Sequence, residues 1–261
     1  MDSIFIQVLF PFIFSFLIVI IITIIAEKFG TKVGGIFGTL PSTIVVAYIF
    51  ISLNKGLVFA SKSVAIIPAE LGVNIIFLLF FAIFVYRSTI VAFTISFASW
   101  TFLSLILYMS QITDIVISIE IYVVILVLSF LFLEYHKKIP SSEKVDIHYT
   151  TKKIIFRGIL AGIIISISVI LSNIGEVISG IFSVFPAILS STMLIFVREH
   201  GPKFTAGMAK SMIIGISSVC TYAIAIHFLY PKYGLILGTL IAYLISLGVT
   251  LILFVFREKI R

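Results

Sequence analysis

The feature that most constrains this chain is a series of long apolar runs that begins near the first residue and continues almost to the last. The first run, Ile4–Ala26, has no charged residue. A helix that crosses the hydrocarbon core of a bilayer needs about 20 apolar residues, so each run is long enough for one crossing. Only 11% of the 261 residues are charged and 61% are hydrophobic, whereas soluble proteins are about 25% charged. The expected fold is therefore all-α, a polytopic transmembrane helix bundle.

Polar or glycine-containing stretches divide the apolar sequence into about nine runs. The one stretch with the polarity of a soluble protein, Tyr135 to Lys153, is too short for a domain and is predicted to be a loop. The predicted helices cover residues 4–26, 34–53, 57–86, 88–110, 114–135, 154–172, 178–197, 203–230 and 234–256.

Basic residues divide unevenly between the two sides of the membrane that nine crossings define. Of the 18 lysines and arginines, all but Lys55, Lys62 and Lys232 fall on one side. Lysine and arginine beside a crossing are retained in the cytoplasm. We therefore expect a multi-pass protein of the cell membrane, with its N-terminus outside and its C-terminus cytoplasmic. The net charge of +7 follows from this asymmetry and from attraction to anionic headgroups, without a nucleic-acid partner.

An offset of 145 residues aligns the chain with itself without a gap. The first four predicted helices then fall on the last four, and the fifth has no counterpart, so the second copy is expected to be inverted in the membrane. The predicted organisation is a four-helix repeat at 1–112, a linker helix at 113–136, a cytoplasmic loop at 137–153 and an inverted four-helix repeat at 154–261. The matches that carry the alignment are Gly30 with Gly175, Gly35 with Gly180, Pro41 with Pro186 and Gly56 with Gly201.

Inverted repeats are typical of secondary transporters, because two opposed half-structures can open alternately to each side of the membrane. The leading functional hypothesis is therefore a transporter or exporter of a small solute or ion, embedded in the lipid bilayer, with a homo-oligomer as a candidate assembly. The alternative is a four-helix protein that formed antiparallel dimers and was fused for stability alone.

Sequence motifs of enzymes are missing from the chain. It has no phosphate-binding glycine loop followed by lysine and serine or threonine, no HExxH and no CxxC, and Cys220 is its single cysteine. We expect no enzymatic activity, no cofactor and no metal site.

The segment from Gly34 to Ile83 resembles the central two helices of the small four-helix GlpM-like membrane proteins. The resemblance is carried by a glycine-rich entry, the proline at 41, a polar turn that ends in Gly56 and a long third helix; the second copy is similar at Gly180, Pro186 and Gly201. It implies two fused copies of a four-helix unit. It also implies a loose link to exopolysaccharide production, which favours the second hypothesis, a membrane assembly or envelope-polymer accessory protein.

The paired prolines predict two broken helices at corresponding depths, because proline inside a helix frees the carbonyl one turn earlier. Pro41 would free the backbone around Phe37 and Gly38, and Pro186 that around Phe182 and Ser183. Interrupted helices at matching positions point to a transporter site, since exposed helix ends present partial charges to an ion or substrate. Alternatively, glycines permit close packing there and hydroxyl groups satisfy the kinked backbone. The candidate hydroxyl groups are those of Thr39, Ser42, Thr43, Ser183, Ser190, Ser191 and Thr192.

Glu70 is the one acid near the middle of a long apolar run. Burying an ionised carboxylate in lipid costs at least about 2.5–3.5 kcal/mol, so Glu70 should be protonated, paired or in contact with water. Asn74 lies one turn further along the same helix face. Glu70 could exchange a proton for a cation or bind a cationic substrate; alternatively, it is a neutral acid hydrogen-bonded to a neighbouring helix. Gly215 occupies the equivalent position in the second copy, so a symmetric pair of carboxylates is not expected.

Lys210 and Ser217 share a face of the penultimate predicted helix with Thr221. They are candidates to line a cavity in the second repeat. Alternatively, Lys210 extends to the cytoplasmic surface, as Lys62 does at its own end. His227 has no second histidine or cysteine at ligand spacing and is expected at the membrane interface.

The topology has a direct test. A cysteine introduced into the 137–153 loop should react with a membrane-impermeant maleimide only after the cells are permeabilised, whereas one beside Asp114 should react in intact cells. Labelling of the 137–153 loop in intact cells would contradict both the orientation and the inversion of the second repeat.

Overall fold

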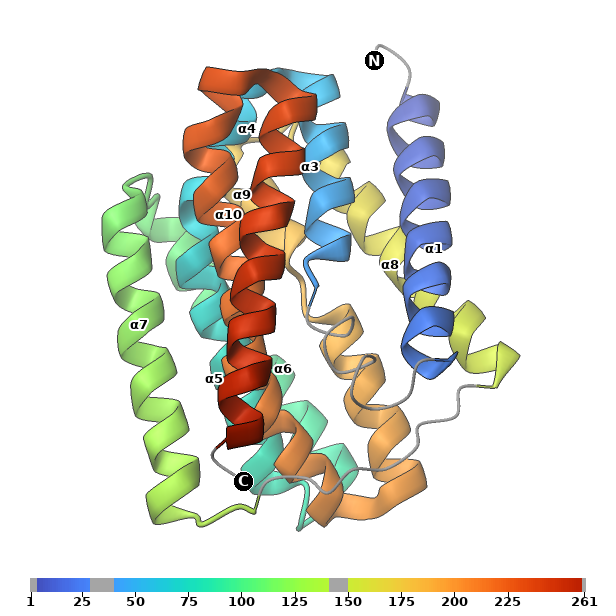
Figure 1. Ribbon diagram of the computed structural model, residues 1–261, viewed down its shortest axis with the longest axis vertical. Helices are drawn as coiled ribbons and strands as arrows, with labels where there is room; N and C mark the ends of the chain where they lie inside the picture. The colour runs from blue at the N-terminus through green and yellow to red at the C-terminus, as the bar shows by residue number, and fades with distance from the viewer. Residues whose placement is uncertain (1–3, 29–39, 141–149, 260–261) are drawn as a thin grey trace.

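The computed structural model describes residues 4–28, 40–140 and 150–259, and nearly all of these residues are helical (Figure 1). The predicted all-α class is therefore confirmed. Residues Gly35, Phe37, Gly38 and Thr39 of the first predicted helix break lie outside the described ranges. The helices are α1 (Ile4–Lys28), α3 (Ser42–Lys55), α4 (Leu57–Ser63), α5 (Ile67–Phe84), α6 (Thr89–Ser110), α7 (Ile115–Leu131), α8 (Thr151–Leu171), α9 (Glu176–Ser183) and α10 (Ala187–Lys259), with a 3₁₀ turn η1 (Val64–Ile66) between α4 and α5 and a π turn η2 (Phe132–His136) after α7.

Six helical stretches of the described chain are long and apolar enough to cross a membrane, and α3 is a shorter apolar helix. These helices fit the predicted multi-pass membrane protein. The six stretches are Phe5–Ile25, Leu57–Phe84, Thr89–Ser110, Ile115–His136, Thr151–Leu171 and Glu176–Leu253.

The last of these stretches turns back on itself twice. Within α10, Gly201 has a φ of 77° and Gly234 a φ of 76°. Glycine tolerates this left-handed backbone region because it has no Cβ. Figure 1 shows α10 reversing direction at opposite ends of the molecule, and a hydrogen bond between the hydroxyl groups of Ser218 and Ser246 joins its second and third parts.

Helices α1 and α8 form an antiparallel pair. Gly158 of α8 faces Phe16, and a Cβ at position 158 would lie 2.8 Å from the Phe16 ring. Two turns later in α8, the Ser166 hydroxyl donates to the Val8 carbonyl at 2.8 Å. The contacted residue number falls in α1 as it rises in α8, which defines the antiparallel direction. Small residues at the contact let the two backbones approach closely, as is typical of helix pairs in membranes.

The chain turns at Pro41 and at Pro186 with the same hydrogen bond. The Ser42 amide donates to the Leu40 carbonyl at 2.8 Å, and the Ala187 amide donates to the Phe185 carbonyl at 2.8 Å. A bond between residues two apart closes a tight turn around the residue between them. Both prolines therefore lie at the start of a helix rather than within one.

The helices that follow these two turns also end alike. The 14-residue helix α3 ends at Gly56, with a φ of 85° and a ψ of 167°. Residues 187–200 end at Gly201, with a φ of 77° and a ψ of 178°. Each glycine connects a short helix to a long one that runs the other way.

The centre of the bundle is α5, which packs against α6, α7 and α10. Its residues are almost all buried. The outer faces of α1, α6 and α7 carry exposed apolar side chains, among them Phe5, Ile90 and Leu128. An apolar exterior is expected where lipid replaces water, because hydrocarbon cannot solvate polar groups.

Close packing of α9 against the α4–η1 junction depends on Gly180. A Cβ at this position would lie 2.3 Å from the Ser63 carbonyl oxygen and 2.6 Å from Cγ2 of Ile66. Because a backbone oxygen cannot rotate away, Gly180→Ala should destabilise the fold by about 1–3 kcal/mol. The measurement is thermal unfolding of the purified protein in detergent, where each kcal/mol lowers Tm by roughly 2–4 °C.

The matched control is Gly248→Ala in α10, because a Cβ there would meet nothing within 4 Å. Alanine is a better helix former than glycine by about 1 kcal/mol. The control should therefore unfold at the same temperature as the parent or above it. A Gly180→Ala protein as stable as the parent would contradict the close contact.

Candidate functional site

Glu70 lies in the first turn of α5 and is completely buried. The helix begins there because Pro68, which has no amide hydrogen, is tolerated at the start of a helix. The next amide, that of Ala69, donates to the Ser118 hydroxyl of α7 at 2.8 Å. A side chain from a neighbouring helix thus satisfies an open end of α5 and fixes the depth of Glu70 in the bundle.

Two side chains of α6 face the Glu70 carboxyl group. The Ser104 hydroxyl donates to Oε1 at 2.7 Å. The Trp100 indole, one turn earlier on α6, neighbours the same group. Among the described residues, however, neither the indole Nε1 nor Glu70 Oε2 has a partner in acceptable hydrogen-bond geometry. Oε2 is therefore buried beside the Trp100 indole without a hydrogen bond of acceptable geometry.

Asn74 connects α5 to the break before Pro186. Its Nδ2 donates to the carbonyl oxygen of Val184 at 2.7 Å, and Val184 lies between the end of α9 and the proline. Within the described chain, Asn74 Oδ1 has no hydrogen-bond partner. Glu70 and Asn74 thus place two open acceptor oxygens on adjacent turns, next to one of the predicted helix breaks.

Aromatic rings enclose this side of the break. Trp100 and Phe185 meet edge to face, with centroids 4.8 Å apart. Phe182 lies edge to face with Trp100 at 6.4 Å, and Phe97 stacks on Phe185 at 6.3 Å. Such ring pairs stabilise their arrangement and exclude water. Through Trp100, the buried carboxyl group lies next to this aromatic cluster.

The two proline turns lie around one small cavity. Thr43, which follows the Pro41 turn, lines it together with Ser183, Phe185 and Ala187 from the Pro186 turn. Its volume is about 10 Å³, near the lower limit of space for one water molecule. The structure therefore brings the start of α3, just after Pro41, next to the turn at Pro186, with hydroxyl groups beside them but little open space between them.

The serines that follow Pro186 bond to their own helix. Ser190 Oγ donates to the Pro186 carbonyl at 2.5 Å, and Ser191 Oγ donates to the Ile188 carbonyl at 3.0 Å. Both hydroxyl groups thus bond to carbonyls of their own helix, and the Pro186 carbonyl also accepts from the Ser190 amide at 2.8 Å. Ser42 is the first residue of α3.

Lys210 and Ser217 lie apart from Glu70. The Lys210 ammonium group donates to the Ile139 carbonyl at 2.6 Å and forms an ion pair with Glu134. Ser217 pairs with the Tyr122 hydroxyl of α7 at 2.8 Å. Neither residue is brought to the helix breaks, and Lys210 is 5% exposed, so it does not extend into solvent.

A second buried polar cluster did not enter the sequence prediction. The largest fully buried side chains of the described chain are Tyr48, Tyr222 and Tyr230. The Tyr48 hydroxyl accepts from Ser63 at 3.2 Å and neighbours Ser183 beside the small cavity. Tyrosines in apolar runs carry no pattern that distinguishes such a cluster from the interfacial tyrosines of other membrane proteins.

Trp100 and Ser104 were also missed by the sequence analysis. They are one turn apart on α6, as Glu70 and Asn74 are on α5. This matched spacing of polar groups on two neighbouring apolar helices was the available signal. In the described parts of the chain, no three histidine, cysteine, aspartate or glutamate side chains gather as metal ligands would.

Comparisons of the chain with family models, with curated proteins and with solved structures give no match.

The hydrogen bond from Ser104 to Glu70 can be tested by removing the hydroxyl. Ser104→Ala should destabilise the protein by about 1–3 kcal/mol, because it leaves a second buried oxygen of Glu70 without a donor. Thermal unfolding is the measurement. Ser110→Ala on the same helix is the control, since that exposed hydroxyl bonds only to its own helix at Leu107. Equal stability of the two variants would exclude Ser104 as the partner that holds the carboxyl group.

Proposed function

We propose that this chain is a secondary transporter of a small solute or ion, built from two inverted repeats that open alternately to the two sides of the membrane. The observation that carries the proposal is the pair of proline turns, which share one hydrogen-bond pattern and are each followed or flanked by residues that line one small cavity. Discontinuous helices at matching positions are the arrangement in which transporters bind substrate and coupling ions.

Three observations support the inverted repeats. The turns at Pro41 and Pro186 and the glycines that end the following helices are each 145 residues apart. The Val45 amide donates to the Pro41 carbonyl and the Ser190 amide donates to the Pro186 carbonyl, and these two donors are also 145 residues apart. Finally, α1 and α8, which are counterparts in the repeat, pack antiparallel, as opposite orientation requires.

The proposal includes nine crossings with the N-terminus outside and the C-terminus in the cytoplasm. Gly201 and Gly234 divide α10 into three parts. If α9 and residues 187–200 together make one crossing, there are four crossings from α8 onward. With 113–136 as the single linker crossing, the second repeat is inverted relative to the first. The loop at 137–153 then lies in the cytoplasm together with most of the basic residues.

Glu70 is the proposed coupling residue. A proton on Oε2 makes the carboxyl group a donor, and Asn74 Oδ1 on the next turn is an open acceptor. Loss of that proton leaves two acceptor oxygens, Glu70 Oε2 and Asn74 Oδ1, to which a cation can bind. Because Asn74 also holds the Val184 carbonyl, the exchange of proton for cation is transmitted to the helix break.

Transport through this site requires a change of conformation. The cavity of about 10 Å³ between the two breaks admits at most about one water molecule. Opening must therefore separate the turns at Pro41 and Pro186, towards one side of the membrane and then the other. Helix breaks suit this movement, because few backbone hydrogen bonds cross them.

A second candidate function is a non-transport role in membrane assembly or envelope-polymer production. The dry aromatic packing of Trp100, Phe182 and Phe185 at the break favours it, as does the resemblance to GlpM-like proteins. A protein of this kind needs no cavity to open, and it would bind no small solute at Glu70.

The test of transport is proton movement in proteoliposomes loaded with a pH-sensitive dye. Sodium, potassium and tetramethylammonium are added outside in turn, and exchange of one of them for internal protons makes the interior alkaline. Glu70→Gln should fold normally and abolish this signal, because glutamine keeps the size of the side chain but cannot release a proton. The same purified proteins are tested for thermal stabilisation by each cation, which follows binding.

Glu120→Gln is the matched control, because Glu120 is an exposed acid on α7 and its loss should change neither readout. If the unmodified protein gives neither a change of internal pH nor thermal stabilisation with any of these cations, the assembly role would be favoured. Proton exchange that persists in well-folded Glu70→Gln protein would remove Glu70 from the mechanism.

A further inference from the structure

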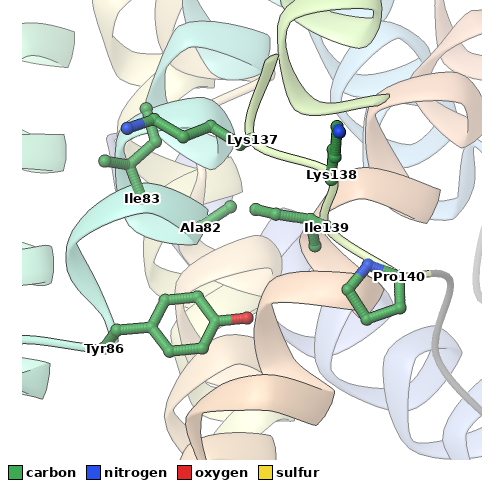
Figure 2. Close-up of a pocket in the computed structure, with 7 residues that line it drawn as sticks. All are labelled: Ala82, Ile83, Tyr86, Lys137, Lys138, Ile139 and Pro140. Carbon is green, nitrogen blue, oxygen red and sulfur yellow. The ribbon is translucent and has the colours of Figure 1, made fainter. Parts of the chain in front are cut away.

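A cavity of about 280 Å³ lies where α5 ends and the chain leaves η2 (Figure 2). Its floor is apolar and consists of Ala82, Ile83 and Ile139. Its polar lining comes from Tyr86, Lys137 and Lys138. Figure 2 shows the Tyr86 hydroxyl pointing from the end of α5 towards the segment with Ile139, while the Lys137 side chain extends over Ile83. The cavity is therefore apolar on one side and cationic on the other.

The wall that carries the two lysines is held in a defined conformation. Lys138 adopts a φ of 49°, an unusual left-handed conformation for a residue with a side chain. The turn is closed by the Ile139 amide, which donates to the Leu133 carbonyl at 3.0 Å. The Ile139 carbonyl accepts in turn from the buried Lys210 ammonium group at 2.6 Å. Strained backbone of this kind persists where surrounding contacts over-determine it, and it often marks a binding site.

The positive charge of the cavity is left available. The nearest acid on this segment, Glu134, forms an ion pair with Lys210. Within the described residues, Lys137 and Lys138 form no ion pair, and the Lys137 ammonium group lies 5.8 Å from the centre of the Phe132 ring. Two ammonium groups and a phenol hydroxyl are therefore free to bind an anion.

The position of the cavity along the bundle is that of a membrane interface. The candidate crossing Leu57–Phe84 contains Ala82 and Ile83 at its end, so the floor lies at the edge of the hydrocarbon. Tyr86 follows the crossing and is 52% exposed. Tyrosine is enriched at the level of the lipid headgroups, and basic pockets between membrane helices on the cytoplasmic side bind anionic headgroups.

We propose that this cavity binds the headgroup of an anionic phospholipid. The phosphodiester lies between the ammonium groups of Lys137 and Lys138 and accepts a hydrogen bond from the Tyr86 hydroxyl. The glycerol backbone and the first acyl carbons lie on Ala82 and Ile83. Lys210 is a positioning residue, because it holds the Ile139 carbonyl and neutralises Glu134 without contacting the lipid. This site is independent of the proposed transport at Glu70.

The test measures binding of phosphatidylglycerol and of phosphatidylcholine to the full-length protein in detergent, by native mass spectrometry and by thermal unfolding. The parent should bind phosphatidylglycerol more tightly and be stabilised by it. In the double variant Lys137→Gln/Lys138→Gln, affinity for phosphatidylglycerol should fall on the order of 10- to 30-fold, since each lysine near an anionic headgroup contributes about one factor of five. Affinity for phosphatidylcholine should not change.

The matched control is Lys55→Gln/Lys62→Gln, which removes the same charge from two exposed lysines at the other end of the bundle. It should bind phosphatidylglycerol like the parent. If the double variant at the cavity does not fold, Tyr86→Phe carries the test, because it removes one hydroxyl and should weaken binding severalfold. Equal binding of the two lipids, equal weakening in the control, unchanged binding in a folded cavity variant, or equal stabilisation by free inorganic phosphate would overturn the proposal.

Discussion

The hydrogen bond from Asn74 to the Val184 carbonyl joins the most deeply buried helix to the point where a neighbouring helix is interrupted. In hydrocarbon an open backbone group costs several kcal/mol, because no water can replace the missing partner. Each backbone group that a helix interruption leaves open inside this bundle must therefore find a hydrogen-bond partner within the protein. The Asn74 side-chain amide donates to the Val184 carbonyl, and the Ser190 backbone amide donates to the Pro186 carbonyl. At the start of α5, the Ser118 hydroxyl accepts from the Ala69 amide.

Among the described residues, three acidic or basic side chains are buried, Glu70, Arg157 and Lys210. Lys210 and Glu70 are accommodated differently. Lys210 has an acid, Glu134, and a backbone carbonyl as partners, so its charge is neutralised in place. Glu70 is held by a single hydroxyl group and keeps one oxygen open. A buried ion pair is suited to fix a segment of chain, here the turn at Ile139. A carboxyl group with an open oxygen is suited to exchange a proton, which is why the proposed coupling is assigned to Glu70.

Glycine has two separate uses in this fold. At Gly56 and Gly201 it adopts left-handed backbone that lets a short helix reverse into a long one. At Gly158 and Gly180 the backbone is helical, and the missing side chain makes room for a ring of α1 and for the Ser63 carbonyl. The first use determines the path of the chain, and the second determines how closely its helices pack.

The sequence alone determined the all-helical fold, the long apolar helices that fit a membrane protein and the turns at Pro186 and Gly201, because apolar length, proline and glycine act on the backbone locally. Pro186 and Gly201 are where the chain turns, as the offset to Pro41 and Gly56 had indicated. The rotation of each helix about its own axis came only with the tertiary structure. A helix with few polar side chains, such as α5 with Glu70 and Asn74, has too weak an amphipathic pattern to reveal which side faces each neighbour. Hence Ser104 was not recognised as the partner of Glu70, and Lys210 was assigned to a cavity although Glu134, far away in sequence, binds it.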